Sequence, residues 1–181
     1  VARMADYLRA YPTHTAALVS VELCSLTLQR EDLSVVNFIA SGLVGDGAAA
    51  VIGRGAAVGA KGPKVVETRS VFYPDTECVM GWDIRSSGFK VVLSAKLPDI
   101  VRENLRPDVD SFLHEHGLQR RDLTTWICHP GGPAVLHALK DALELTDQDL
   151  ELTWRSLREI GNLSSSSVLW VFHETPAAAA G

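Results

Sequence analysis

The sequence predicts an α/β fold with a largely parallel core sheet, and three observations support that prediction. Segments with helical periodicity alternate with short apolar or alternating segments along the 181 residues, an order typical of α/β proteins. Glycine and proline stand at most of the junctions between these segments, where the chain has to turn. Hydrophobic residues make up 46% of the chain and charged residues 22%, so a globular core can form.

The first part of the chain predicts two helices and two strands. Apolar Met4, Ala5 and Leu8 fall on one side of a helix, and Pro12 follows its end. The expected elements are a helix over residues 2–10, a buried strand over 16–23, a helix over 34–45 and a small-residue strand over 45–55. The stretch GAKGP, residues 59–63, is the best candidate for a linker.

The second part of the chain predicts further strands and helices in alternation. The expected elements are strands over 64–74, 89–94, 124–128 and 168–174, and helices over 97–117, 133–144 and 149–160. Pro74 ends the first of these strands, and a loop that holds Gly81 and Asp83 follows it. Pro107 lies inside the long helix and is expected to kink or divide it.

Composition excludes several classes of function. A net charge of -5 without a cluster of lysine and arginine speaks against nucleic-acid binding. No apolar run approaches the roughly 18 to 20 residues that a membrane span needs. The cysteines Cys24, Cys78 and Cys128 show no CxxC spacing, which fits reduced thiols in the cytoplasm better than a disulfide framework or a zinc site. Asp75 and Asp83 without a histidine are weak evidence for any other metal.

The two ends of the sequence lead us to expect a piece of a longer chain. The sequence opens inside a helical pattern, without a methionine or an N-cap residue. It stops at HETPAAAAG, a low-complexity stretch directly after an apolar segment.

One stretch, WICHPGGP, presents a histidine where an apolar strand is expected to end. Ligands of open α/β sheets collect at the carboxyl ends of strands. Pro130 fixes its own backbone, while Gly131 and Gly132 permit tight turns, so His129 would be held rigidly beside an accessible main chain. A histidine that merely caps the strand explains this stretch equally well.

A second stretch, GNLSSSSVLW, places Asn162 directly after the expected helix end at Gly161. Taken alone, it is better explained by a helix-capping glycine followed by an Asx turn. The pair of stretches supports another interpretation. The Nε2–H of a histidine and the amide NH₂ of an asparagine are both donors. Two donors that converge on one thioester carbonyl oxygen would form an oxyanion hole for acyl transfer.

These stretches resemble the His and Asn motifs of type III polyketide synthases, the chalcone and stilbene synthase family. The two residues lie 162 − 129 = 33 positions apart, as in that family. GLVGDGAAAVI (42–52) resembles its glycine-rich loop and strand, and SVELCSLTLQ (20–29), with Glu22, resembles the strand before it. The resemblance extends from about Ala2 to Glu174. Initiating ketoacyl synthases also use His and Asn, but their histidine is not followed by Pro-Gly-Gly-Pro.

The resemblance implies a thiolase-like fold, layered αβαβα, built from two similar halves. Residues 1–58 would be the end of the N-terminal half, and residues 59–181 the C-terminal half without its final hairpin. The implied protein is an acyltransferase that acts on acyl-CoA and malonyl-CoA and needs no cofactor beyond these CoA thioesters. It would be a cytoplasmic homodimer, with no nucleic acid and no membrane span.

The resemblance also assigns chemical roles. A cysteine thiolate would take the acyl group, while His129 and Asn162 polarise malonyl-CoA for decarboxylation and hold the enolate. That cysteine is expected a few positions before Val1, where a helix N-terminus favours a thiolate. Cys24, expected within a strand, Cys78 and Cys128 do not replace it. An assembly module that keeps the fold without the chemistry is therefore the alternative.

The expected substrate contacts suggest a long acyl chain. Val44 and Val91 stand where the family has phenylalanines, and Cys24 stands where it has a threonine. Each additional buried CH₂ contributes about 0.8 kcal/mol, so a pocket without two rings would suit a long-chain acyl-CoA starter, with alkylpyrone or alkylresorcinol products. Simple core packing is the alternative role for Val44. Further contacts implied by the resemblance are Thr27, Gly81, Gly131, Gly132, Pro133, Ala134 and Ser164.

Overall fold

The computed structural model describes residues 1–59 and 62–176, so the expected linker 59–63 lies partly outside the described residues. In chain order the elements are α1 (Ala2–Ala10), β1 (Thr15–Glu22), the 3₁₀ turn η1 (Cys24–Thr27), α2 (Val35–Leu43), β2 (Gly47–Arg54), β3 (Met80–Arg85), β4 (Gly88–Leu93), α3 (Leu97–Glu115), the 3₁₀ turn η2 (Arg120–Asp122), α4 (Pro133–Leu143), α5 (Glu151–Glu159) and α6 (Ser165–Glu174). Within these bounds, no helix is long and apolar enough to cross a membrane.

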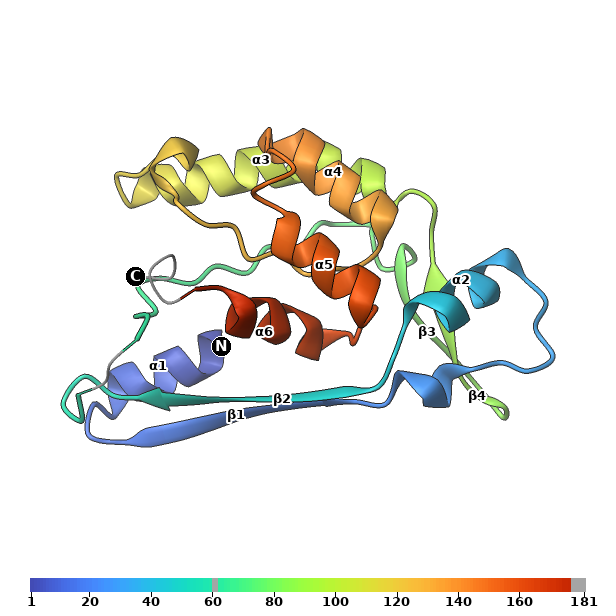
Figure 1. Cartoon of the computed structure of the whole chain (residues 1–181), viewed down its shortest axis with the longest axis horizontal. Helices are drawn as coiled ribbons and strands as arrows, with labels where there is room; N and C mark the ends of the chain where they lie inside the picture. Colours follow the sequence, from blue (N-terminus) through green and yellow to red (C-terminus); the bar gives the residue numbers. More distant parts are fainter. Residues whose placement is uncertain (60–61, 177–181) are drawn as a thin grey trace.

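The elements are arranged in layers (Figure 1). Helices α3 and α4 pack together on one side of the molecule. Helices α1 and α6 lie against the long ribbon of β1 and β2 on the other side. Between these two groups, the chain before β3 and the chain before α4 cross the middle of the view in extended form. Layers of helices thus alternate with extended chain and the β1–β2 ribbon, which agrees with the predicted α/β class.

The strands pair in an antiparallel manner, and the predicted parallel sheet is wrong for the described residues. β1 pairs with β2, and β3 pairs with β4, in two separate antiparallel ladders. The one parallel contact among the described strands and bridges is isolated, between Val44 and Asn162. The sequence pattern distinguishes strands from helices, but strand direction depends on which strands become neighbours in space.

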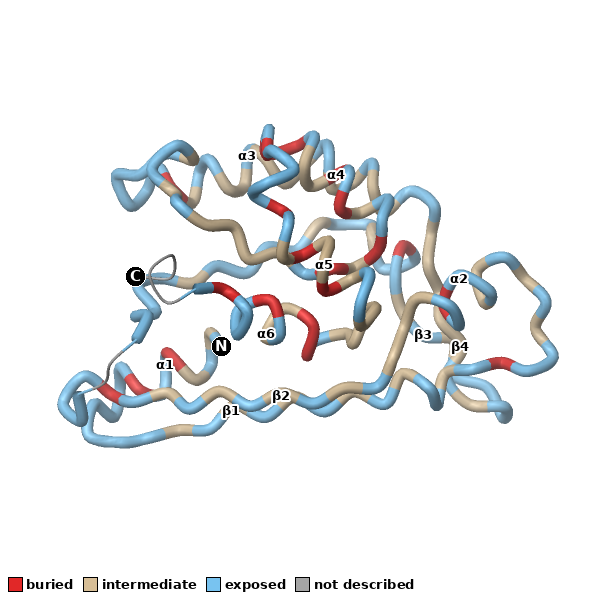
Figure 2. The backbone as a smooth tube through the Cα atoms, viewed as in Figure 1, coloured by how far each residue is buried: buried red, intermediate tan, exposed pale blue. Residues whose placement is uncertain are grey.

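The β1–β2 ribbon has one covered face and one open face, as Figure 2 shows by its alternation of colours. The covered side faces α1 and α6. On the open side Val19 is 68%, Val21 61% and Ile52 60% exposed. Apolar side chains on a sheet face are ordinarily covered by another layer, so this surface is suited to bury against further protein.

The chain over 80–85 is a strand, whereas the sequence predicts a loop there. Met80, Trp82 and Ile84 alternate on one face of β3, but Gly81 and Asp83 between them are poor strand formers and obscure this pattern. β3 forms because it folds back on β4 through a tight connection that ends at Gly88. Gly88 has φ of 110°, which glycine adopts without strain.

The chain over 168–174 is part of helix α6, so the predicted strand there is wrong. A short apolar run such as VLWVF suits a buried strand or a buried helix equally. The preceding serines decide the outcome. The amide of Ser166 donates to Leu163 O at 3.2 Å, and Ser167 Oγ accepts from the amide of Leu163 at 2.6 Å. These bonds satisfy the first turn, and Ser166, Ser167 and Val171 are buried with helical spacing.

Segments 64–74 and 124–128 belong to neither ladder in the described part of the chain, so neither is the predicted sheet strand. Their composition favours extended backbone, but a strand also needs a neighbour to complete its ladder. The other elements are confirmed within a few residues: α1, α2, α3, α4 and α5, and β1, β2 and β4. The prediction that the first strand is buried is wrong, because the residues of β1 alternate between exposed and half-buried. Pro107 does not divide α3, which is one helix.

The core of the second half gathers around the connection between α4 and α5. Leu143, Leu145 and Leu150 are buried together. The partly buried hydrophobic residues packed against them are Leu105, Val109, Trp126, Cys128 and Trp154. Apolar burial of this kind contributes roughly 25 cal/mol per Å² removed from water. Trp126 and Cys128 therefore anchor the segment that leads to His129.

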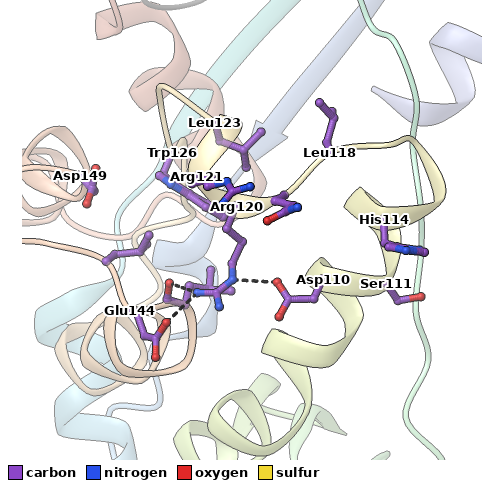
Figure 3. Close-up of a pocket in the computed structure, with 13 residues that line it drawn as sticks. Asp110, Ser111, His114, Leu118, Arg120, Arg121, Leu123, Trp126, Glu144 and Asp149 are labelled. Carbon is purple, nitrogen blue, oxygen red and sulfur yellow. Dashed lines mark hydrogen bonds and ion pairs between the residues drawn. The ribbon is translucent and has the colours of Figure 1, made fainter.

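Two arginines cap the C-terminal end of α4. Arg106 Nε donates to Ala142 O at 2.7 Å, and Arg120 Nη1 donates to Leu143 O at 2.6 Å. Arg120 also forms ion pairs with Asp110 at 2.7 Å and with Glu144 at 3.3 Å (Figure 3). Cations that bind the last carbonyl groups of a helix satisfy unpaired acceptors and complement the helix dipole. These arginines thus hold α4 against α3.

Substitution of Arg120 tests this cap. We expect Arg120→Ala to lower the free energy of unfolding by about 1–3 kcal/mol, because the charged donor to the carbonyl of buried Leu143 is lost. Urea denaturation measures the change. The control is Arg121→Ala, since Arg121 has no hydrogen bond or ion pair with any residue of 1–59 or 62–176. Equal destabilisation by the two substitutions would contradict the proposed cap.

Candidate active site

His129 stands in a tight turn between the buried core and helix α4. The amide of Gly131 donates to His129 O at 2.9 Å, which closes the turn. Pro130 is fully buried, whereas His129 is exposed. A Cβ atom at Gly131 would lie 3.3 Å from Cδ2 and 3.6 Å from Nε2 of His129. The imidazole ring therefore lies directly over Gly131, where a larger residue would crowd it.

Gly132 connects this turn to α4 in a conformation that favours glycine. Its φ is 149°, and a Cβ atom there would lie 3.2 Å from Leu43 Cδ2 at the end of α2. Helix α4 then begins at Pro133, whose missing N–H is not needed in the first turn. Pro133 and Ala134 are exposed beside the turn. The turn is therefore rigid, with Pro130 and Gly132 buried, Gly131 half-buried and Pro133 exposed.

Asn162 lies between α5 and α6, and its backbone joins the two halves of the chain. Its amide donates to Leu43 O at 2.8 Å, and its carbonyl accepts from the amide of Gly45 at 3.0 Å. Gly161, just before it, has φ of 88°, and a Cβ atom there would lie 2.7 Å from Leu43 O. Asn162 is thus fixed by close contact with the segment that follows α2.

The side chain of Asn162 is oriented by two hydrogen bonds. Oδ1 accepts from the amide of Ser164 at 2.8 Å, which is the Asx turn expected from the sequence. Nδ2 donates to Gly131 O at 3.1 Å. The His129 ring and the Asn162 amide therefore both contact Gly131, although the sequence separates them. One N–H of the amide points to Gly131, and the second is available to another acceptor.

Serines behind Asn162 tie α6 to the β1–β2 ribbon. Ser165 donates from its amide to Glu22 Oε1 at 3.2 Å, and the two side chains are also hydrogen-bonded. Ser20 Oγ lies 2.6 Å from Ser165 Oγ and 3.0 Å from Ser166 Oγ. Ser164 is half-buried and has φ of 51°, an uncommon conformation for a residue with a side chain. This local strain is held in place by the bonds on both sides.

Val44 and the η1 residues lie near this junction. Val44 is half-buried and forms the isolated bridge with Asn162. Cys24 opens η1 rather than lying within a strand, because β1 ends at Glu22. Thr27 Oγ1 donates to Cys24 O at 2.8 Å. Asp46 fixes this turn, since its carboxylate accepts from the amide and hydroxyl of Ser25, each at 2.7 Å.

The settings of Cys24 and Cys128 favour the protonated thiol. Burial, with the charges of Glu22 and Asp46, raises the pKa of Cys24 above its ordinary value of 9.0. Burial alone raises the pKa of Cys128 to about 11. Thiolates, not thiols, are the nucleophiles of acyl transfer. These environments therefore disfavour either cysteine as the nucleophile, as expected from the sequence.

The β3–β4 ribbon separates two residues that the sequence assigns to one pocket. Val91 pairs with Trp82 across the ladder, and Gly81 pairs with Val92. Directly paired residues share a face, whereas neighbours in a strand alternate. Gly81 and Val91 therefore lie on opposite faces. Trp82 shares the face of Val91 and contacts Phe89 edge-on, with ring centroids 6.1 Å apart. The sequence predicts that Trp82 packs in the core or in a loop, but Trp82 lies in β3 and is 55% exposed.

A separate cavity of about 830 Å³ lies beside the Arg120 cap and is lined by neither His129 nor Asn162. Figure 3 shows Arg120 between Asp110 and Glu144 in this cavity. No cluster of three or more metal-ligating side chains occurs in the part of the chain that the structure describes.

Comparison with known proteins establishes the family. The profile for "Chalcone and stilbene synthases, C-terminal domain" matches residues 64–179. The chain is 55% identical over 175 residues to the 1,3,6,8-tetrahydroxynaphthalene synthase of Streptomyces peucetius subsp. caesius, covering 95% of this chain and 46% of that protein. It is 31% identical over 170 residues to the alpha-pyrone synthesis polyketide synthase-like Pks18 of Mycobacterium tuberculosis H37Rv, covering 92% and 43%.

Solved structures agree with the family match. The 1,3,6,8-tetrahydroxynaphthalene synthase of Streptomyces coelicolor A3(2), a bacterial type III polyketide synthase, superposes with a TM-score of 0.88 at 34% identity, covering 96% of this chain and 50% of that one. PKS-I of the brown alga Ectocarpus siliculosus gives a TM-score of 0.87 at 29% identity, covering 93% and 45%. The chain belongs to the chalcone and stilbene synthase family and has its thiolase-like fold. It spans about half the length of these relatives.

The pKa of His129 provides a test of this geometry. Although the residue as a whole is exposed, partial desolvation of its ring lowers the pKa below the ordinary value of 6.5, because desolvation disfavours the imidazolium. We therefore expect the His129 resonances to titrate below pH 6.5 in an NMR experiment. The folded state then resists protonation more than the unfolded state does, so this group removes stability as pH falls through 6.5. The variant His129→Gln assigns the resonance, and a midpoint above 6.5 would contradict the buried setting.

Proposed function

We propose that this chain is the C-terminal part of a type III polyketide synthase. The reaction is a decarboxylative Claisen condensation between an acyl group and malonyl-CoA. The observation that supports it best is the meeting of His129 and Asn162 at Gly131, where Asn162 Nδ2 donates to Gly131 O at 3.1 Å and the His129 ring lies over the same glycine. Two donors beside one backbone turn fit an oxyanion-binding role.

The proposed chemistry assigns one donor to each residue. Malonyl-CoA loses CO₂, and the electron pair of the broken bond moves onto the thioester oxygen as an enolate. The Nε2–H of His129 and the Nδ2–H of Asn162 stabilise that oxygen. The enolate carbon then attacks the carbonyl of the thioester-bound acyl group, and the thiolate leaves. Burial lowers the pKa of His129, so the neutral ring keeps one N–H to donate.

The acyl group requires a thiolate, and the proposal assigns that role to a cysteine outside this sequence. Burial raises the pKa of both Cys24 and Cys128, which favours their protonated forms. A nucleophilic cysteine instead needs a positive environment such as a helix N-terminus or a neighbouring imidazolium. The proposal further includes a cytoplasmic homodimer with acyl-CoA and malonyl-CoA as substrates and no additional cofactor.

The starter specificity has two candidates. Val44 and Val91 stand where the family has phenylalanines, which supports a long-chain acyl-CoA starter and alkylpyrone or alkylresorcinol products. The polyketide synthase-like Pks18, a relative named for alpha-pyrone synthesis, supports the same class. Two observations favour a second candidate, in which a compact product is made from malonyl-CoA alone. Trp82 pairs with Val91 and supplies a ring on its face. The 55% identical relative is named for tetrahydroxynaphthalene, a compact product without an alkyl chain.

Substitution of the two motif residues in the full-length enzyme tests the reaction. His129→Ala and Asn162→Ala should each lower the rate of malonyl-CoA decarboxylation by about 100-fold to 1,000-fold, because each removes one oxyanion donor. Release of CO₂ measures the rate. His114→Ala is the matched control, since His114 is exposed on α3 and outside the turn. An inactive wild-type enzyme would favour the assembly-module alternative.

A starter panel distinguishes the two specificities. The long-chain proposal expects lauroyl and longer CoA esters to exceed aromatic and short esters in kcat/KM, while the second candidate expects product from malonyl-CoA alone. Trp82→Ala should raise kcat/KM for lauroyl-CoA relative to acetyl-CoA by about tenfold, since removal of a ring opens space for methylenes. Ile84→Ala, on the same face but opposite Phe89, is the control. Preference for aromatic esters would exclude the long-chain proposal.

A further inference from the structure

We infer that Gln29 is a positioning residue that sets the distance between two walls of the acyl pocket, an inference that rests on the proposed function. The proposed function assigns η1, with the expected substrate contacts Cys24 and Thr27, to one wall. It assigns the β3–β4 ribbon, where Val91 pairs with Trp82, to the other. Gln29 is only 8% exposed, although glutamine is ordinarily a surface residue.

The side chain of Gln29 connects η1 to the ribbon. Its Oε1 accepts from Ser87 Oγ at 2.7 Å, at the turn between β3 and β4. Its Nε2 donates to Phe89 O on β4 and to Thr27 O at the end of η1, each at 3.4 Å. The oxygen and the nitrogen of the Gln29 amide are thus both hydrogen-bonded, and the nitrogen contacts both η1 and β4. A shorter side chain could not make these contacts together.

The backbone of Gln29 is fixed in turn by helix α2. Asn37 Nδ2 donates to Gln29 O at 2.8 Å and to Asp32 O at 2.7 Å. Asn37 belongs to the first turn of α2, whose N-cap Ser34 accepts from the Asn37 amide at 3.3 Å. Gln29 is therefore a rigid strut, since one end is held by a helix and the other reaches the ribbon.

An ion pair supports the same junction. Lys90 Nζ lies 2.6 Å from Asp32 Oδ2, and both side chains are largely buried, at 29% and 18% exposure. Lys90 lies between Phe89, which Gln29 contacts, and Val91 on the pocket face. Hydrogen bonds and this ion pair lower the pKa of Asp32 to about 2, so its carboxylate stays charged at neutral pH. The ribbon is thus attached at two neighbouring points, through the Phe89 carbonyl to Gln29 and through the Lys90 side chain to Asp32.

No ladder joins η1 to the ribbon within residues 1–59 and 62–176, since the described strands pair only within their own ribbons. The two walls approach closely at the tip, where a Cβ atom at Gly88 would lie 3.7 Å from Leu26 O. Because backbone pairing does not fix their spacing, side-chain contacts must do so. Thr27 lies two residues before Gln29, and Val91 lies two residues after Phe89. A displacement of the contact between Gln29 and Phe89 would therefore also move the expected substrate contacts Thr27 and Val91.

Three variants of the full-length enzyme test the inference. Gln29→Ala removes the strut, Ser87→Ala removes only the bond from the exposed turn, and Asp83→Asn is the control. Asp83 pairs with Arg85 on the same ribbon, at 2.5 Å, and does not contact Gln29. The measurement is the ratio of kcat/KM for the longest and shortest acyl-CoA starters that the wild type accepts, together with kcat for malonyl-CoA decarboxylation and the melting temperature.

We expect Gln29→Ala to change the selectivity ratio by about tenfold and Ser87→Ala by about threefold, because displacements on the order of 1 Å at a reacting site cost up to about 100-fold. Decarboxylation by His129 and Asn162 should change less than the ratio. An unchanged ratio in both variants, or equal losses for all starters that follow the melting temperature, would overturn the positioning role. A wild-type enzyme without synthase activity would instead overturn the proposed function and this inference with it.

Discussion

The hydrogen bonds between the backbone of Asn162 and the segment after α2 are the contact on which the rest of the site depends. The Asn162 amide donates to Leu43 O, and its carbonyl accepts from Gly45. These two bonds join the chain before residue 59 to the chain after it. They also fix the direction from which the Asn162 side chain reaches Gly131. Without this junction, the His and Asn motifs would belong to two loops with no defined separation.

Small residues make that junction possible. A side chain at Gly161 would collide with Leu43 O, and a side chain at Gly47 would collide with Leu163 at 2.7 Å. Backbone segments can therefore approach closely, and their polar groups satisfy one another, as buried N–H and C=O groups require. The same principle acts at the edge of the pocket. There Gln29 provides with its side chain the contacts that a ladder provides elsewhere.

In the β3–β4 ribbon, the proposed starter specificity depends on how the two strands pair. Valine at position 91 suggests an open pocket when the sequence is considered alone. The ladder register then brings Trp82 opposite Val91, so the volume at this place depends on two strands together. Cross-strand neighbours of this kind are invisible in a single sequence, because the pairing partner of a residue is set by the position of the turn. The proposed starter specificity therefore depends on register as much as on composition.

The sequence by itself determined the α/β class, most helices and the two motifs, because helical periodicity, glycines at turns and the placement of His129 and Asn162 are local properties. It did not determine α6, β3 or the strand directions. An apolar run such as 168–174 fits a helix or a strand, and only the serine bonds and the packing on β1–β2 decide between them. Tertiary structure also decided which motif residues meet, since the contact at Gly131 arises from backbone pairing between segments more than 100 residues apart.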